Sequence, residues 1–405
     1  MAQTAATPPT GPPVSRIHHD ACHCLGLKSD FQQPGDGRAH PHISASDLVC
    51  VVGIGRILRV TSFLRLEWLA HSPARAGLGL KAPFGEDVLA YCTGRMDPET
   101  TRTALAAALH QAKRNQAFEN SRFIGLAVDG TGAGRTYKEP CPPCDPIKDA
   151  QGEVHGSLPH FVRISVVGVG WTLPINVEPD APGDREYAAA QRLLRRVIHH
   201  LGPRFADYLV ADGEYATAAF LHTSGNVGLP VVARLKENLP LLAAPVRARF
   251  DGQPPRAVFQ EGDDRVEVWD DDHFDPWETF NWSEVRVLRY RQHQREGTII
   301  QAEWLTDCSI AKLGSLSFYR MAKSRWEIEN QGFNDGKNRD GMEHICHHEP
   351  NSILIVWLLI LLALVMERLY RRRSLHRGDH GIRSAINRLD YLCLSLGTRN
   401  PPDTS

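Results

Sequence analysis

The order of the apolar runs between residues 122 and 238 constrains the fold of this chain more than any other feature. The strand-like runs cover residues 122–130, 160–170, 171–179, 206–215 and 229–238. An apolar stripe at helical spacing over residues 184–202 predicts a helix between the third and fourth runs, and a short helix is expected between the last two. Three adjacent strands followed by helix–strand alternation predict an α/β fold, in which a mixed sheet carries flanking helices.

In two of these runs the strand is expected to end in the same way, at an aspartate followed by glycine. "LAVDG" ends on Asp129 and Gly130, and "LVADG" ends on Asp212 and Gly213. Sites in open α/β sheets form at the carboxyl ends of the strands, so neighbouring strands would bring the two carboxylates together. Two close carboxylates repel each other unless a cation lies between them, and Mg²⁺ is the natural oxygen-seeking candidate. The alternative interpretation of each Asp-Gly pair is an ordinary turn.

The segment "RWEIENQGFNDGK" has an unusual spacing of charged and aromatic residues. On a helix, Arg325, Glu329, Phe333 and Lys337 would share one face, since they are successive i, i+4 positions. One interpretation is an ion-paired surface helix with Phe333 in the core. In the other, Glu329 completes a three-carboxylate cluster with the two aspartates, and the flanking Arg325 and Lys337 bind phosphates.

Taken together, these motifs resemble the DDE transposases of bacterial insertion sequences, in the superfamily with a Tyr-Arg-Glu-Lys signature around its last acid. The resemblance rests on "LAVDGTG", on "LVADGEYA" followed by "VVARLKEN", and on "RWEIENQGFN", and it covers roughly residues 128–366. In this chain Ala322 occupies the signature tyrosine position, and Tyr319 lies three residues upstream. Lys337 lies one position beyond the signature lysine.

The resemblance implies a ribonuclease H-like mixed sheet with flanking helices, interrupted by a β-rich insertion between the second and third acids. The expected organisation is a disordered tail (1–45), a helical N-terminal domain that is a candidate DNA-binding domain (46–117), the first part of the core (118–238), the insertion (239–310), and the rest of the core with the catalytic helix and C-terminal helices (311–395).

The activity that the resemblance implies is metal-dependent cleavage and strand transfer of an insertion sequence. Asp129, Asp212 and Glu329 would be the catalytic residues and would hold Mg²⁺ or Mn²⁺, with two ions expected. The residues expected to contact DNA or its phosphates are Arg325, Lys337, Lys236, Arg234 and Trp277. The expected partner is double-stranded DNA, as transposon ends and target, bound by a homodimer in the bacterial cytoplasm at the nucleoid.

Composition limits how DNA could be bound. The net charge is −1, so a DNA partner must be held by local patches and not by a global positive field. Hydrophobic residues make up 42% of the chain and charged residues 23%, which is typical of a globular protein. The nine cysteines are scattered and odd in number, which favours a reducing compartment over a disulfide framework. The apolar run over residues 353–366 is short for a membrane span, which needs about 20 residues, so it predicts a buried core helix and no membrane partner.

Several other motifs leave alternatives open. The acidic stretch 261–282 predicts either a solvated loop anchored by aromatic side chains or a site where Trp277 stacks on an unpaired base. "CPPC" (141–144) is either a loop with incidental cysteines or half of a zinc site. The basic run 370–377 is either a solvated helix end or a DNA backbone contact, and "HICHHE" (344–349) is either a loop or a metal site.

The sequence also leaves other functions open. The chain could be a ribonuclease H-like nuclease that cuts without strand transfer, or a catalytically inactive DNA-binding relic. It could also be a nucleotide-binding protein that uses the glycine-rich turn "DGTGAGRT", although this turn lacks the Lys-Ser/Thr of a P-loop.

Overall fold

The computed structural model describes residues 36–78, 80–118, 121–132, 134–137, 144–181, 183–328 and 342–372. These residues divide into two compact units. The helical unit takes residues from Met1–Ala117, Ala133–Leu158 and Asp335–Ser405, and the sheet unit takes residues from Phe118–Gly132 and Pro159–Asn334.

The helical unit contains the helices that the sequence predicts over residues 46–117. They are α3 (Ala45–Ile57), α4 (Phe63–His71), the 3-10 helix η2 (Pro73–Leu78), α5 (Glu86–Thr93) and α6 (Pro98–Arg114). The start of α6 follows from its sequence, because the Asp97 side chain caps the helix by accepting a hydrogen bond from the Glu99 N–H and Pro98 occupies the first turn.

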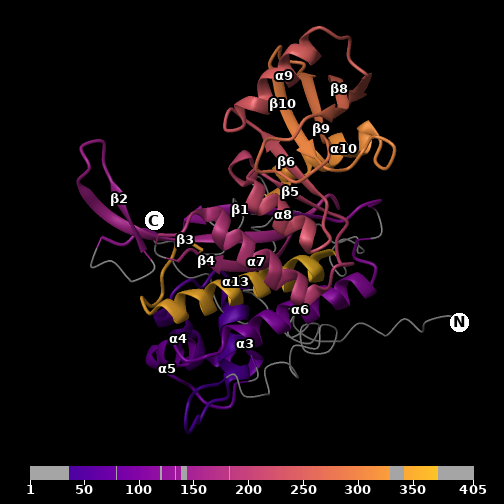
Figure 1. Ribbon diagram of the computed structural model, residues 1–405. Helices are drawn as coiled ribbons and strands as arrows, with labels where there is room; N and C mark the ends of the chain where they lie inside the picture. Colours follow the sequence, from indigo (N-terminus) through magenta and orange to yellow (C-terminus); the bar gives the residue numbers. More distant parts are fainter. Residues whose placement is uncertain are drawn as a thin grey trace, which may run out of the picture. The chain divides into compact units, whose positions relative to one another are not determined.

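The apolar run predicted over residues 353–366 lies within α13 (Pro350–Tyr370), which packs against α3, α5 and α6 (Figure 1). Its first turn is tied to the end of α5, since the Asn351 side-chain amide donates to the backbone oxygens of Thr93, Gly94 and Met96. Among the described helices, only α13 is long and apolar enough to cross a membrane, yet 78% of its most apolar window is buried. The segment therefore takes the predicted form of a core helix.

The sheet unit is built on the strands that the sequence predicts. They are β1 (Gly125–Gly132), β3 (Val154–Val167), β4 (Leu173–Pro179), β5 (Tyr208–Ala211) and β6 (Val231–Leu235). β1, β5 and β6 are parallel neighbours, whereas β3 is antiparallel to β1 and β4 is antiparallel to β3. Helices α7 (Glu186–Leu201) and α8 (Ala218–Asn226) fill the two predicted helical positions. The predicted mixed sheet with flanking helices is confirmed.

The β-rich insertion does not form a separate sheet. After α9 (Pro240–Asp251) it contains β7 (Ala257–Glu261), β8 (Asp264–Phe274), β9 (Val285–His293) and β10 (Ile299–Thr306). β10 pairs antiparallel with β6, so the insertion continues the sheet through β10, β9, β8 and β7 (Figure 1). With β2 (Cys144–Lys148) at the opposite edge, the described strands form one ten-stranded sheet of mixed direction.

Of the two interpretations of the acidic stretch 261–282, the solvated loop is wrong for residues 264–274. Residues 264–274 form β8, which pairs on one side with β7 and on the other with β9. The error has a physical cause: the carboxylates of this stretch mask its strand pattern. One of them, Asp270 of β8, is buried through an ion pair with Arg286 of β9.

After the insertion, α10 (Ser315–Lys323) and α11 (Arg325–Glu327) lead to the end of this described range. Phe318, Tyr319 and Ala322 of α10 and Ile328 are buried in a core cluster with Ala127 of β1 and other residues of the sheet. This packing places the segment around Arg325 against the face of the sheet that carries Ala127. Since side chains two apart on a strand share a face, Asp129 lies on the same face.

The units divide the chain differently from the predicted domains. Residues 133–158, predicted as part of the core, belong to the helical unit, and so does the part of the predicted range 311–395 from Asp335 onward. For the segment from Asp335 onward the reason is burial, because α13 covers its apolar surface with α3, α5 and α6. Residues 1–35 of the predicted tail and residues 373–395 lie outside the described residues.

Candidate active site

Asp129 and Asp212 lie on adjacent parallel strands. The last register pair between β1 and β5 is Val128 with Ala211, and the two aspartates are the next residues on their strands. β1 does not stop at Asp129, as the sequence suggested, but runs on to Gly132 because residues 130–132 continue to pair with β3. Asp212 does follow the end of its strand, and it precedes the short 3-10 helix η3 (Gly213–Tyr215). The two aspartates are therefore adjacent across the strands, as predicted, although only Asp212 lies at a strand end.

Arg325 contacts both aspartates. Its Nη2 lies 3.5 Å from Asp129 Oδ2 and 3.9 Å from Asp212 Oδ1. The three side chains are largely withdrawn from water, with exposed fractions of 6% for Arg325, 18% for Asp129 and 16% for Asp212. A guanidinium in this position offsets the repulsion between the two carboxylates.

Lys236, just beyond the end of β6, supplies a second cation. Its Nζ lies 2.5 Å from Asp212 Oδ2, and its side chain is 42% exposed. Burial alone would raise the pKa of Asp212. The hydrogen bonds from Lys236 and from the Gly213 N–H, together with the charge of Arg325, outweigh burial and hold that pKa below its ordinary value. Asp212 is therefore ionised at neutral pH.

The glycines that follow the two aspartates are needed for close approach and not for a turn. A Cβ atom on Gly213 would lie 2.6 Å from Cδ of Lys236, the side chain that reaches Asp212. A Cβ atom on Gly130 would collide with the carboxylate of Glu186, which in turn accepts a hydrogen bond from the Tyr215 hydroxyl. Both Asp-Gly pairs thus allow a neighbouring side chain to pack against the backbone beside the acid.

The donor set of this site suits a divalent cation. Both aspartates offer carboxylate oxygens on one face of the sheet, and Asp212 Oδ1 is buried and accepts no hydrogen bond from a described residue. Within the described ranges no group of three His, Cys, Asp or Glu side chains is placed to hold a metal ion. The predicted third ligand, Glu329, lies outside the described residues, as do Phe333 and Lys337, so the three-carboxylate cluster stays a prediction.

Comparisons with known proteins add little to this geometry. No protein-family model matches the sequence, and no curated protein matches it. Among solved structures, the chain is similar to the piggyBac transposase in a cryo-electron microscopy structure of its synaptic complex with hairpin DNA. The two share 11% sequence identity with a TM-score of 0.47, over 93% of this chain and 80% of that one. Similarity at this level does not assign an activity to the chain.

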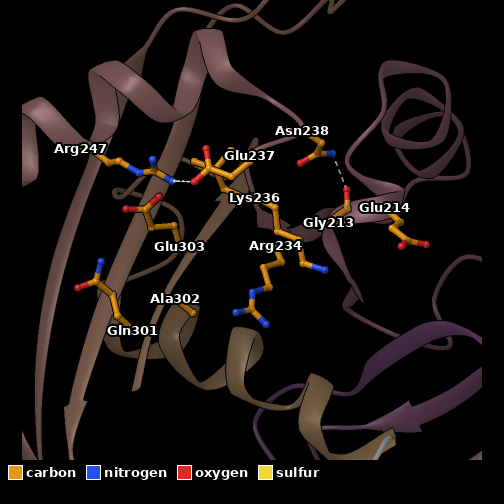
Figure 2. Close-up of a pocket in the computed structure, with 11 residues that line it drawn as sticks. Gly213, Glu214, Arg234, Lys236, Glu237, Asn238, Arg247, Gln301, Ala302 and Glu303 are labelled. Atoms are coloured by element: carbon orange, nitrogen blue, oxygen red, sulfur yellow. Dashed lines mark hydrogen bonds and ion pairs between the residues drawn. The ribbon is translucent and has the colours of Figure 1, made fainter. Parts of the chain in front are cut away.

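A cavity of about 600 Å³ opens at Gly213, the residue that follows Asp212 (Figure 2). It is lined by Gly213 and by side chains of β6 and the residues after it, including Arg234, Lys236 and Asn238. The Asn238 amide donates to the Gly213 carbonyl at 2.8 Å, and Arg247 pairs with Glu237 (Figure 2). The predicted phosphate-binding residues Arg234 and Lys236 thus line one cavity, and Lys236 also pairs with Asp212.

Trp277, the residue predicted to stack on a base, already stacks on a neighbour. Its ring lies 4.3 Å from that of Phe280 at an interplanar angle of 13°, and Phe280 also packs against Trp282 and His222. These contacts match the alternative in which aromatic side chains anchor the loop. Base stacking by Trp277 stays a prediction that only its other face could fulfil.

Tyr319, the nearest tyrosine to the signature position, is a core residue. Its hydroxyl donates to Glu261 Oε2 at 2.7 Å, and Lys323 donates to the same oxygen. Burial in this environment, next to the Glu261 carboxylate, raises its pKa. The hydroxyl therefore links α10 to β7, so Tyr319 does not play the part of the signature tyrosine at the acids.

The structure argues against two of the alternative interpretations, a zinc site at "CPPC" and phosphate binding by the glycine-rich turn. Cys144 is disulfide-bonded, so its thiol is not available to zinc. The glycine-rich turn continues β1 and then bridges to β3 through Thr136, and the next described element is the strand β2 and not a helix that could bind phosphates at its N-terminus.

The two remaining motifs give no site within the described residues. In "HICHHE", Cys346 accepts a hydrogen bond from Arg56 and donates to the Thr61 carbonyl, and no metal-binding group forms there. In the basic run 370–377, Tyr370 is the last residue of α13, and residues 371 and 372 continue it with π-helical backbone. Residues 373–377 lie outside the described residues.

Sequence reasoning missed one charged residue beside the acids. Arg163 of β3 is the register partner of Asp129 and is almost completely buried. Directly paired residues on adjacent strands project to the same face, so Arg163 adds positive charge on the side of Asp129. Its signal in the sequence is a single arginine inside the apolar run "HFVRISVVG". The role of Arg325 as a partner of both carboxylates was also missed, because the spacing indicated only phosphate binding.

Proposed function

We propose that this chain is a DNA transposase that cleaves and joins DNA by a DDE mechanism. One observation carries the proposal: Asp129 and Asp212 occupy equivalent positions on adjacent parallel strands, and Arg325 of the third motif lies against both. Residues separated by 83 and 113 positions meet at one site, in the order and spacing of the motifs that resemble the transposase family. An ordinary turn after each strand would not require this convergence.

Each side chain has a role in this proposal. Asp129 and Asp212, joined by Glu329, would hold the divalent ions, which when bound activate a water or a DNA 3′-hydroxyl and stabilise the leaving oxygen. Arg325 and Lys236 present cations beside these acids, where a scissile phosphate would lie, and Arg234 lines the neighbouring cavity. The low pKa of Asp212 keeps it ionised and able to bind a cation at neutral pH. The chain would act on double-stranded DNA as a dimer.

The test uses the full chain and the DNA that flanks its own gene, including any inverted repeats. Wild-type protein with Mg²⁺ or Mn²⁺ is expected to cut at the repeat ends and to join them to a second DNA. Asp129→Asn, Asp212→Asn and Glu329→Gln should each bind the ends and lose cleavage by at least about a hundredfold. Asp263→Asn is the matched control, because its side chain is 75% exposed and pairs only weakly with Arg295.

The outcomes separate the alternatives. Cleavage without preference for the repeat ends and without joining would indicate a nuclease. Absence of cleavage with either metal would indicate an inactive DNA-binding relic. Full activity in Asp129→Asn and Asp212→Asn would reject the site itself.

A further inference from the structure

The carboxylates of the candidate site already have cationic partners within the chain. Arg325 lies 3.5 Å from Asp129 and 3.9 Å from Asp212, and Lys236 lies 2.5 Å from the other oxygen of Asp212. Arg325 is withdrawn from water, so its charge is screened less than that of a surface arginine. The same oxygens are those that a divalent ion would need.

We propose that Arg325 and Lys236 are internal counter-ions, which compete with a divalent metal ion for Asp129 and Asp212. This inference rests on the proposed function. The two counter-ions stabilise the folded chain by neutralising two close acids, and the same pairing weakens metal binding. The two cations therefore set the metal affinity of the site, in addition to any contact they make with DNA.

The two cations are held in different ways. Arg325 reaches both acids from α11, which the buried residues of α10 and Ile328 hold on the sheet, so it cannot leave without a change at a packed segment. Lys236 reaches only Asp212, and it does so over Gly213, from a half-exposed position. Loss of Arg325 should therefore affect metal binding more than loss of Lys236.

Direct measurement of Mn²⁺ binding to the full chain without DNA tests the proposal, with free Mn²⁺ followed by electron paramagnetic resonance. Arg325→Gln is expected to bind Mn²⁺ about tenfold more tightly than wild type, and Lys236→Met to show a smaller gain. Arg247→Gln is the matched control, since Arg247 lines the neighbouring cavity but pairs with Glu237, and it should bind as wild type does.

A second readout separates competition from a purely structural role. Without metal, Arg325→Gln should melt at a lower temperature than wild type, because both largely buried carboxylates lose one cationic partner. Saturating Mn²⁺ should then raise its melting temperature by more than it raises that of wild type. A structural role alone would lower the melting temperature without tightening Mn²⁺ binding.

Affinity of Arg325→Gln for Mn²⁺ at or below that of wild type overturns the proposal. If that variant does not fold, Lys236→Met decides by the same criterion. Asp129→Asn distinguishes failure of this inference from failure of the proposed function. If Asp129→Asn loses Mn²⁺ binding while Arg325→Gln shows no gain, the metal site stands and only the competition between the two cations and the metal is rejected. If Asp129→Asn binds Mn²⁺ as wild type does, the proposed active site fails first.

Discussion

At the scale of single residues, the acids are held by neighbours that the chain brings from other elements. Asp212 lies between Lys236, next to β6, and Arg325 of α11, and Gly213 leaves room for the Lys236 side chain. The lowered pKa of Asp212 is the consequence of this arrangement. A group whose pKa is lower in the folded than in the unfolded chain stabilises the fold above its unfolded pKa, and this stabilisation is lost as the pH falls through the folded pKa.

Lys236→Met should therefore reduce stability in a pH-dependent way. In metal-free buffer, the variant is expected to be less stable than wild type at neutral pH. The difference should disappear as the pH falls from about 3.8, the ordinary pKa of an aspartate, through the lowered pKa of Asp212. Urea unfolding at a series of pH values measures it. In an Asp212→Asn background the same substitution should have no pH-dependent effect, and a pH-dependent difference there would contradict the assignment.

At the scale of elements, the strands of the insertion help to hold Arg325 at the candidate site. β10 continues the sheet from β6, and α10 packs on the strands of the insertion before the chain reaches Arg325. A buried ion pair strengthens this connection: Arg286 of β9 pairs with Asp270 of β8 and also donates to the backbone oxygens of Cys308 and Leu313. The segment leading into α10 is thereby fixed to the sheet.

Asp270→Ala should destabilise the sheet unit strongly, because it leaves the Arg286 guanidinium buried without its carboxylate. The exposed fractions of the two side chains are 1% and 0%, and loss of one partner of such a pair costs about 3–5 kcal/mol. Urea unfolding followed by tryptophan fluorescence measures the change. Asp263→Ala breaks the exposed pair with Arg295 and should cost less than about 1 kcal/mol. Equal effects of the two substitutions would show that burial of the pair is unimportant.

At the scale of the whole molecule, two units of different construction share one chain. The helical unit is organised around α13, whose side chains from Ile355 to Met366 are buried, and the sheet unit is organised around the parallel strands β1, β5 and β6. Each unit combines segments from distant parts of the sequence. Damage to the core of one unit is therefore expected to affect all of its segments together.

Leu361→Ala tests this organisation. Leu361 is fully buried in α13, and its truncation should cost about 2–5 kcal/mol. Hydrogen exchange measured by mass spectrometry should show faster exchange in α3, α5, α6 and α13, while the amides of β5 and β6 keep their protection. Leu209→Ala in β5 is the reciprocal control and should affect the sheet strands. Uniform loss of protection in both variants would contradict two separate cooperative units.

The sequence by itself determined the succession of strands and helices from residue 122 to residue 238 and singled out the two Asp-Gly pairs that follow apolar runs. It could do so because local apolar periodicity and Asp-Gly pairs are encoded within short windows. The tertiary structure decided that β10 joins β6, that α13 belongs with the N-terminal helices, and that Arg325 pairs with both aspartates. These features depend on contacts between residues tens to hundreds of positions apart. The free energy of such contacts comes from tertiary packing, which the local propensities of a short sequence window do not describe.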